Sequence, residues 1–95
     1  MYFVTTLYIK NKEVENERTI GMYSSEEYAS ENVERNVHDM FEKGYYNYAV
    51  VSKMGYGTYQ TPDILSWYKY DAHTKEVSKC EMPEGMERYY PYIIG

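Results

Sequence analysis

The chain has 95 residues, which favours one domain with one modest hydrophobic core. Hydrophobic residues make up 43% of the chain and charged residues 26%, and these ordinary values exclude wholesale disorder. The formal net charge is −5 and no run of Lys and Arg occurs, which argues against a binder of duplex DNA or RNA. The N-terminus lacks the charged start of a signal peptide, and no apolar run is long enough to span a membrane. We therefore expect a single cytoplasmic domain over residues 1–95 that does not bind membranes.

Tyrosine is the anomaly of the composition. The chain has 14 Tyr but only 2 Phe and 1 Trp, whereas a core built for packing alone draws more evenly on Phe, Leu and Ile. Tyrosine combines an apolar ring with a polar tip, so it suits half-buried positions and interfaces. Strands also favour aromatic residues, which explains any single tyrosine but not all of them. The composition therefore predicts a tyrosine-rich binding surface.

The N-terminal third predicts a β-hairpin. Residues 2–9 (YFVTTLYI) are rich in β-branched and aromatic types, and both alternating faces are apolar or Thr, which predicts a central strand. The polar stretch 10–17 predicts a turn, and residues 18–23 (RTIGMY) predict the second strand. Gly21 inside this strand indicates a bulge or a close approach by another backbone.

One helix follows, over residues 25–43. Ser24 lies three residues before Glu27, which is the spacing of a capping box, and Tyr23 and Tyr28 take the positions of a hydrophobic staple. Gly44 is a natural residue to follow the helix end. The spacing of Glu31 and Arg35 predicts an ion pair on the exposed face. Apolar residues recur at helical spacing and form one stripe: Ala29, Val33, Val37, Met40 and Phe41.

Three strands are predicted after the helix, at residues 46–53 (YNYAVVSK), 64–70 (ILSWYKY) and 75–82. Residues 71–74 make a tight turn in which Asp71 bonds the following backbone. Residues 83–95 have no periodicity and are expected to be an extended or partner-docking C-terminal tail. The order ββαβββ predicts an α+β fold, with a mostly antiparallel five-stranded sheet, the helix packed on one face and many tyrosines on the other.

The loop at residues 54–63 (MGYGTYQTPD) is the first candidate binding site. Its glycines let a ligand approach the backbone, whose N–H groups can hold an anion, and its tyrosines can stack on a ring. The pattern is not a P-loop, and an ordinary glycine-rich connection between strands is the alternative. The candidate residues here are Tyr56, Gly57, Thr58 and Tyr59.

A cluster of strand tyrosines is the second candidate site. On a strand, Tyr46 and Tyr48 share a face, as do Tyr68 and Tyr70, so these four form one patch if the two faces coincide. Cross-strand aromatic pairs that only stabilise the sheet are the alternative. The candidate residues here are Tyr45, Tyr46, Tyr48, Tyr68 and Tyr70, with Tyr89, Tyr90 and Tyr92 of the tail as additions.

No constellation for catalysis or metal binding is recognisable in the sequence. His38 is predicted on the polar helix face, His73 in a turn, and Asp71 with His73 supplies only two potential ligands. Cys80 is the only cysteine, which rules out an internal disulfide and fits a reducing cytosol. We therefore expect no catalytic residue, no metal and no cofactor.

The segments RTIGMYSS, GYYNYAVV and SWYKYD, with the capped helix between the first two, resemble small α+β proteins of low-GC Gram-positive bacteria and their phages. The resemblance covers residues 18–71 and implies the fold alone, because the group has no assigned function. We predict a non-enzymatic, homo-oligomeric binding protein that engages a protein or a small ligand such as a nucleotide. One version is a phage or mobile-element inhibitor that blocks a bacterial defence factor or sequesters its nucleotide signal. The alternatives are a housekeeping cytosolic interaction module and an enzyme with an unrecognised site.

Overall fold

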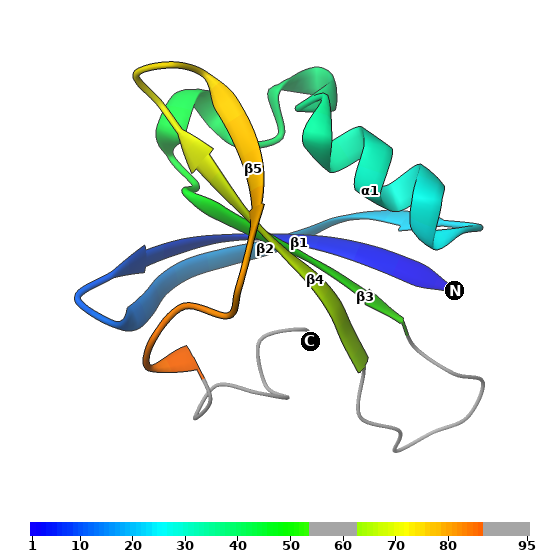
Figure 1. Ribbon diagram of the computed structural model, residues 1–95, viewed down its shortest axis with the longest axis horizontal. Helices are drawn as coiled ribbons and strands as arrows, with labels where there is room; N and C mark the ends of the chain where they lie inside the picture. The colour runs from blue at the N-terminus through cyan, green and yellow to red at the C-terminus, as the bar shows by residue number, and fades with distance from the viewer. Residues whose placement is uncertain (54–62, 87–95) are drawn as a thin grey trace.

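The computed structural model describes residues 1–53 and 63–86 as one antiparallel five-stranded sheet with a single α-helix on one side (Figure 1). The strand order is β2-β1-β3-β4-β5, so the predicted α+β fold and its ββαβββ order are confirmed. The elements are β1 (Tyr2–Lys10), β2 (Glu13–Tyr23), α1 (Glu26–Glu34), β3 (Tyr48–Lys53), β4 (Asp63–Asp71) and β5 (Glu76–Cys80), with two 3-10 turns at Val37–Asp39 and Glu42–Gly44. No helix in the described ranges is both long and apolar enough to cross a membrane.

The β1–β2 hairpin is longer than the sequence pattern indicates. β1 lies between β2 and β3, as its two apolar faces predicted, but the turn consists only of Asn11 and Lys12, with φ of 53° and 64°. The prediction of a turn over residues 10–17 is therefore wrong. β2 is an edge strand, where charged residues such as Glu15 and Glu17 can face solvent without breaking the strand. A two-residue turn of this left-handed kind also matches the natural twist of a hairpin.

The predicted bulge at Gly21 is confirmed. Val4 pairs with Gly21 and Thr5 with Thr19, so Ile20 is the extra residue of β2. A Cβ atom on Gly21 would lie 2.7 Å from the ring of Tyr23, so the close neighbour is a side chain and not a backbone. The absence of a Cβ atom at Gly21 thus makes room for the ring of Tyr23.

The helix begins one residue later than predicted. Ser25 is the N-cap, and its Oγ accepts a hydrogen bond from the backbone N–H of Tyr28 at 3.1 Å, so the capping box at Ser24 is wrong. The predicted contact of Tyr23 with Tyr28 is confirmed, with ring centroids 5.5 Å apart in an edge-on arrangement. The predicted ion pair on the exposed face of α1 is also present, with Arg35 Nη1 and Glu31 Oε1 3.3 Å apart.

The helix also ends nine residues earlier than the predicted end at Lys43, since α1 stops at Glu34. Asn36 adopts the left-handed conformation, with φ of 48°, and its Oδ1 accepts a hydrogen bond from the backbone N–H of Phe41 at 3.2 Å. A short amide side chain that bonds the backbone competes with helical pairing, which is why the helix stops here. The 3-10 turns that follow still bury Met40 and Phe41 against the sheet.

Asn47 ties three strands together. Its side-chain amide pairs with the backbone of Ile9 in both directions, because Oδ1 accepts from Ile9 N and Nδ2 donates to Ile9 O, each at 2.9 Å. Its own backbone N–H donates to Leu7 O and its carbonyl accepts from Tyr70 N, both at 3.0 Å. This residue therefore anchors the start of β3 to β1 on one side and to β4 on the other.

The turn between β4 and β5 is held by Asp71, as predicted. Its Oδ1 accepts hydrogen bonds from the backbone N–H groups of His73 at 2.8 Å and Thr74 at 3.3 Å. These bonds favour the charged carboxylate and lower the pKa of Asp71 below its usual value. Lys75, with φ of 61°, completes the turn before β5.

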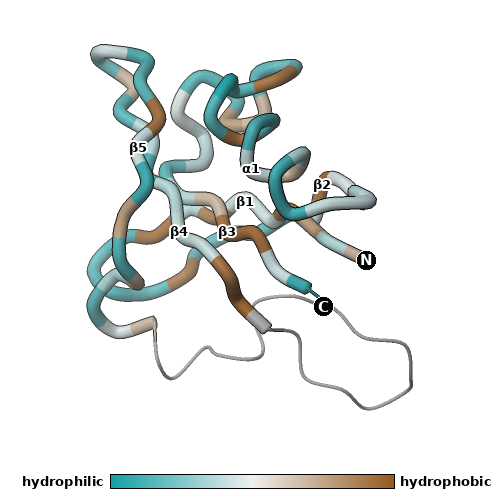
Figure 2. Tube along the Cα trace, turned by 45° about the vertical axis from the view of Figure 1, so that its right-hand side comes forward, coloured by the Kyte–Doolittle hydropathy of each residue, from teal (hydrophilic) through white to brown (hydrophobic). Residues whose placement is uncertain are grey.

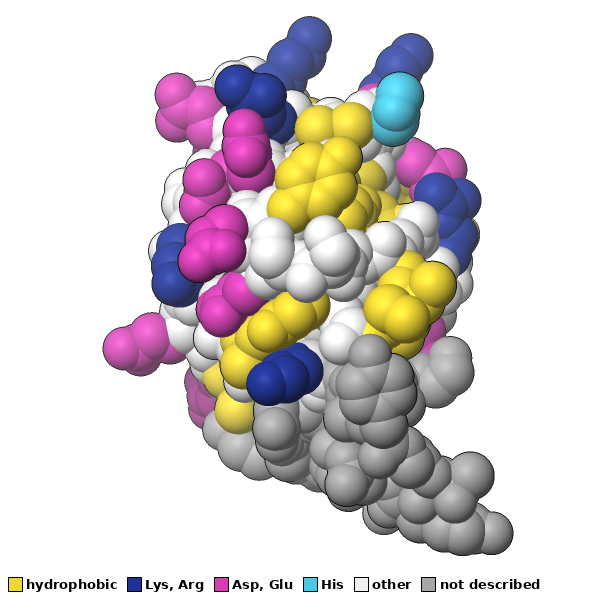
Figure 3. All heavy atoms as spheres, turned by 90° about the vertical axis from the view of Figure 1, so that its right-hand side faces the viewer, with side chains coloured by type: hydrophobic (Ala, Val, Ile, Leu, Met, Phe, Trp, Pro, Cys, Tyr) yellow, Lys and Arg dark blue, Asp and Glu magenta, His cyan; other side chains and the backbone are white. Residues whose placement is uncertain are grey.

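Each face of the sheet carries its own hydrophobic cluster. The cluster under α1 includes a ring stack of Phe41 on Tyr70, with centroids 4.7 Å apart and planes 7° apart. The cluster on the opposite face consists of Leu7, Val50, Trp67 and Met86. Figure 2 shows the hydrophobic stretches along β3 and β4 and the hydrophilic residues at the outer turn between β4 and β5. Figure 3 views the molecule from the right-hand side of Figure 1. Acidic side chains line the left border of this view, and hydrophobic side chains form separate patches.

Within the described residues, the tyrosines do not gather on the face opposite the helix, so that expectation is wrong for this part of the chain. Tyr46, Tyr68 and Tyr70 are buried in the cluster under α1, and Tyr48 packs against the opposite cluster. Tyr2 and Tyr8, which were expected to fill the first strand, pack against the helix-side cluster. The physical reason is the size of the residues that α1 buries: Ala29 and Val33 are small, so large rings from the strands fill the layer between sheet and helix.

Replacing Ser25 with Ala should lower the free energy of unfolding by about 1 kcal/mol, because the first turn of α1 loses its side-chain cap. Ser24→Ala is the matched control and should leave stability nearly unchanged. Urea unfolding followed by circular dichroism measures both. A larger loss for Ser24→Ala than for Ser25→Ala would place the cap at Ser24 and contradict the structure.

Candidate functional site

The edge of β4 is only partly covered by β5. β5 pairs with β4 from Trp67 to Asp71, whereas β4 begins at Asp63. Residues 63–66 therefore pair with β3 on one side and with no described strand on the other. An unpaired edge presents main-chain N–H and C=O groups to any chain that can lie beside it.

A bulge shapes this stretch of edge. Val51 of β3 pairs with Ser66 and Ser52 pairs with Ile64, so Leu65 is the extra residue of β4. Its side chain is 37% exposed although it is fully apolar. Bulges at sheet edges commonly re-aim a side chain, and this one presents Leu65 beside the unpaired edge.

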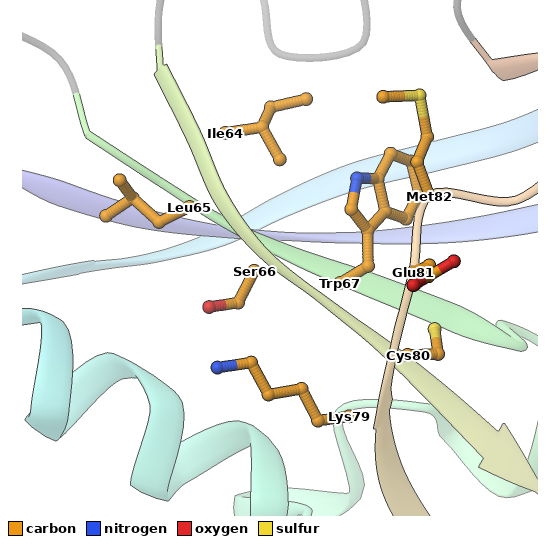
Figure 4. Close-up of a pocket in the computed structure, with 8 residues that line it drawn as sticks. All are labelled: Ile64, Leu65, Ser66, Trp67, Lys79, Cys80, Glu81 and Met82. Atoms are coloured by element: carbon orange, nitrogen blue, oxygen red, sulfur yellow. The ribbon is translucent and has the colours of Figure 1, made fainter.

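A cavity of about 460 Å³ lies where β5 departs from β4. We call it the β4 edge groove, and it is lined by Ile64, Leu65, Ser66, Trp67, Lys79, Cys80, Glu81 and Met82. Figure 4 shows Ile64, Trp67 and Met82 on one side of β4 and Leu65, Ser66 and Lys79 on the other. The groove therefore offers an apolar wall on one side of the sheet and a cationic group on the other.

Trp67 brings a buried hydrogen-bond donor to this groove. The residue is only 5% exposed, and its Nε1 has no hydrogen-bond partner in the described part of the chain. Figure 4 shows this nitrogen on the edge of the indole that faces Ile64. The indole N–H can only donate, and leaving such a group unpaired costs about 1–3 kcal/mol. An acceptor oxygen would satisfy this donor once a bound segment displaces the side chains that cover it.

Ser52 adds a second unpaired polar atom on the same face. Its Oγ is buried and also has no partner among the described residues. Ser52 pairs with Ile64, and Val50, two residues earlier on β3, pairs with Trp67. Residues two apart on a strand share a face, so the hydroxyl and the indole nitrogen belong to one region of the sheet.

Cys80 lines the groove without the features of a reactive nucleophile. Burial raises the pKa of its thiol, and the charge of Lys69 opposes that effect only in part. A raised pKa keeps the thiol protonated at neutral pH, and the thiolate is the reactive form. The Cys80 thiol therefore lacks the lowered pKa that activates a nucleophilic cysteine.

The predicted patch of four tyrosines is not formed. Tyr68 and Tyr70 do share a face, but both are buried beneath α1 together with Tyr46. Tyr48 lies on the opposite face because β3 begins at that residue, so strand alternation does not extend back to Tyr46. Tyr45 alone of the five is exposed, and its hydroxyl accepts a hydrogen bond from the side-chain amide of Asn16.

The remaining predicted site residues lie outside the described part of the chain. These are Tyr56, Gly57, Thr58 and Tyr59 of the glycine loop, with Tyr89, Tyr90 and Tyr92 of the tail. Their assignment to a binding surface stays a prediction.

The sequence pattern missed Trp67 and Leu65 as site residues. The one signal in the sequence is the single tryptophan, because the predicted strands 64–70 and 75–82 are of nearly equal length. A strand of nine residues paired with one of five must leave part of its edge uncovered. That mismatch becomes visible only when the register of the pair is known.

The described residues contain no group of three His, Cys, Asp or Glu side chains that could hold a metal ion. His38 and His73 are both exposed and lie on different turns. No protein-family model, curated protein or solved structure matches the chain. The resemblance to small proteins of Gram-positive bacteria and their phages therefore stays a prediction.

The unpaired hydroxyl of Ser52 gives a stability test of this region. Ser52→Ala should raise the free energy of unfolding by about 1 kcal/mol, because it removes a buried polar atom that lacks a partner. Thr5→Val is the matched control, since the Thr5 hydroxyl is bonded to Thr19 Oγ1 at 2.9 Å and its loss should cost about 1 kcal/mol. Urea unfolding of both variants decides the point. A loss of stability in Ser52→Ala as large as that in Thr5→Val would show that Ser52 has a partner.

Proposed function

We propose that this protein is a protein-interaction module that binds an extended segment of a partner as an added strand along β4. The observation that supports this function is that no described strand covers the edge of residues 63–66, which borders a groove whose buried indole N–H has no partner among the described residues. Strand addition to a sheet edge gives affinity through main-chain hydrogen bonds and specificity through pockets for alternate side chains. The β4 edge groove has both components.

The groove limits the chemistry of the segment that it receives. Side chains of an added strand alternate between the two sides of the sheet. On one side an apolar side chain meets the wall formed by Ile64, Trp67 and Met82, where a carbonyl or carboxylate oxygen pairs with the indole N–H. The groove also contains one charge of each sign, Lys79 and Glu81, which favour a polar side chain at the neighbouring position of the segment.

The opposite edge of the sheet is protected against the same kind of contact. β2 presents the exposed charged residues Glu15, Glu17 and Arg18 along its length, and charges on an edge strand discourage further pairing. The uncovered stretch of β4 instead presents Ile64 and Leu65. This contrast favours β4 as the edge at which a partner segment is added.

An inhibitor of a bacterial defence factor would use this edge to bind an extended segment that the factor needs for its own activity. The uncovered edge is short, so only a few main-chain hydrogen bonds form. An interface of that size suits a transient contact more than a permanent one. The identity of the target stays a prediction.

Binding of a peptide is measured through Trp67, whose emission reports the groove directly because it is the only tryptophan. Peptides selected from a random library of extended sequences should shift this emission. Leu65→Lys should weaken their binding about tenfold or more, because a lysine on an edge strand opposes pairing. Met22→Lys is the matched control on the other edge strand, where the side chain is 60% exposed, and it should bind like the parent.

Two results would overturn this proposal. One is a set of selected peptides that bind Leu65→Lys and the parent equally. The other is a parent chain that forms a dimer in size-exclusion chromatography with light scattering while Leu65→Lys is a monomer. In that second case the added strand comes from another copy of this chain and not from a partner protein.

Cys80 supplies an independent readout of occupancy, because the chain has no other cysteine. Its alkylation by iodoacetamide at neutral pH should be slower than that of a free thiol, since burial raises its pKa. A bound peptide should slow the reaction further by covering the groove, as mass spectrometry can follow. A reaction rate that the selected peptides leave unchanged would place them elsewhere on the protein.

A further inference from the structure

A second cleft lies at the far edge of the sheet, between β2 and the segment that follows α1. Its volume is about 270 Å³, and its polar lining comes from Arg18, Tyr23, Tyr28, Asn32 and His38 over a floor that includes Ile20. We propose that this cleft binds a nucleoside monophosphate, a small anion that carries one planar base. None of the described residues that line it also lines the β4 edge groove.

The charge of the cleft favours an anion. None of the described residues that line it is acidic, although the whole chain carries a net charge of −5. Arg18 Nη1 lies 3.5 Å from Glu42 Oε2, which is not part of the lining. A guanidinium has five N–H donors, so this ion pair leaves donors for a ligand, and His38 can donate in either protonation state. Arginine also matches the geometry of phosphate oxygens by paired hydrogen bonds.

The aromatic part of the cleft favours a planar ring. Tyr23 and Tyr28 contact each other edge-on, with planes 75° apart, so each ring supports the other. Tyr28 is nevertheless 54% exposed, and its backbone is fixed by the N-cap bond to Ser25. An exposed ring held in place is a stacking platform, and stacking of a base on such a ring is worth about 1–3 kcal/mol.

The size of the cleft restricts the ligand further. Ligand sites commonly measure about 300–1,000 Å³, so this cleft lies just below that range. It suits one ring and one anionic group, and it is too small for a dinucleotide or a folded peptide. Asn32 is held by a hydrogen bond from its Nδ2 to Tyr28 O at 2.7 Å, which places an amide beside the stacking ring. Amides of this kind pair with the polar edge of a base.

Isothermal titration of the full chain with AMP, GMP, CMP and UMP tests the proposal. At least one of them should bind, and Arg18→Gln should weaken it about tenfold or more, because a charged hydrogen bond is lost. Glu42→Gln should tighten binding, since it releases Arg18 from its ion pair. The matched controls are Arg35→Gln and Glu31→Gln, which make the same charge changes in the ion pair on α1 and should leave affinity unchanged.

The ring is tested by Tyr28→Ala and Tyr28→Phe, of which only the first should lose affinity. Inorganic phosphate and adenosine, titrated alone, should each bind more weakly than AMP. The proposal is overturned if no nucleotide binds, if Arg18→Gln and Arg35→Gln lose affinity equally, or if phosphate binds as tightly as AMP. Circular dichroism of each variant confirms that a loss of binding is not a loss of fold.

Discussion

The four hydrogen bonds of Asn47 set the register on which both sides of the sheet depend. The side-chain amide of Asn47 makes the two hydrogen bonds to the Ile9 backbone that a paired strand residue would make, one residue before β3 begins. The bond from Tyr70 N to Asn47 O then fixes β4 against the same point. From this anchor, Tyr46 enters the cluster beneath α1 and Tyr48 enters the cluster on the other face. A shift of one residue would exchange the two faces of β3 and expose its core side chains.

The same register produces the unequal edges of the sheet. β4 pairs with β3 from Asp63 to Lys69, and β5 ends at Cys80 opposite Trp67, so no described strand covers the bulged start of β4. Most small sheets protect such a stretch with charge, as β2 does here. The β4 edge instead combines an apolar wall with a buried donor that lacks an acceptor among the described residues. An unpaired buried donor is costly for a domain whose stability margin is small, which is consistent with a site retained for binding.

The sequence predicted the parts of this fold that are decided by local chemistry. The five strands and their order, the contact between Tyr23 and Tyr28, and the Asp71 turn follow from residue type and short-range spacing. The helix length could not be predicted from its apolar stripe, because the side chain of Asn36 bonds Phe41 and stops α1. The first hairpin was misplaced because an edge strand needs no apolar pattern.

The candidate sites were harder to predict than the fold, because both depend on how segments far apart in the chain end beside one another. The β4 edge groove requires that β5 be shorter than β4, and the second cleft requires that Arg18 lie next to the turn after α1. The number of tyrosines does not show which rings are exposed, and Tyr46, Tyr68 and Tyr70 of the predicted patch are buried. Tyr68 is buried between the sheet and α1, whereas Tyr28 lies on α1 itself and is exposed to solvent.

The two sites lie at opposite edges of one sheet, and this placement constrains how they can interact. β1 and β3 separate β2 from β4, so a ligand at one site does not touch a ligand at the other. Any coupling between the two sites has to pass through the packed strands. It also has to be reciprocal, because each ligand must change the affinity of the other by the same factor. The ladders that join β1 to β3 and β3 to β4 have a single register fixed at Asn47, which offers no second arrangement for a ligand to select. Independent binding at the two edges is therefore what this architecture favours, with each ligand adding its own increment to the stability of the fold.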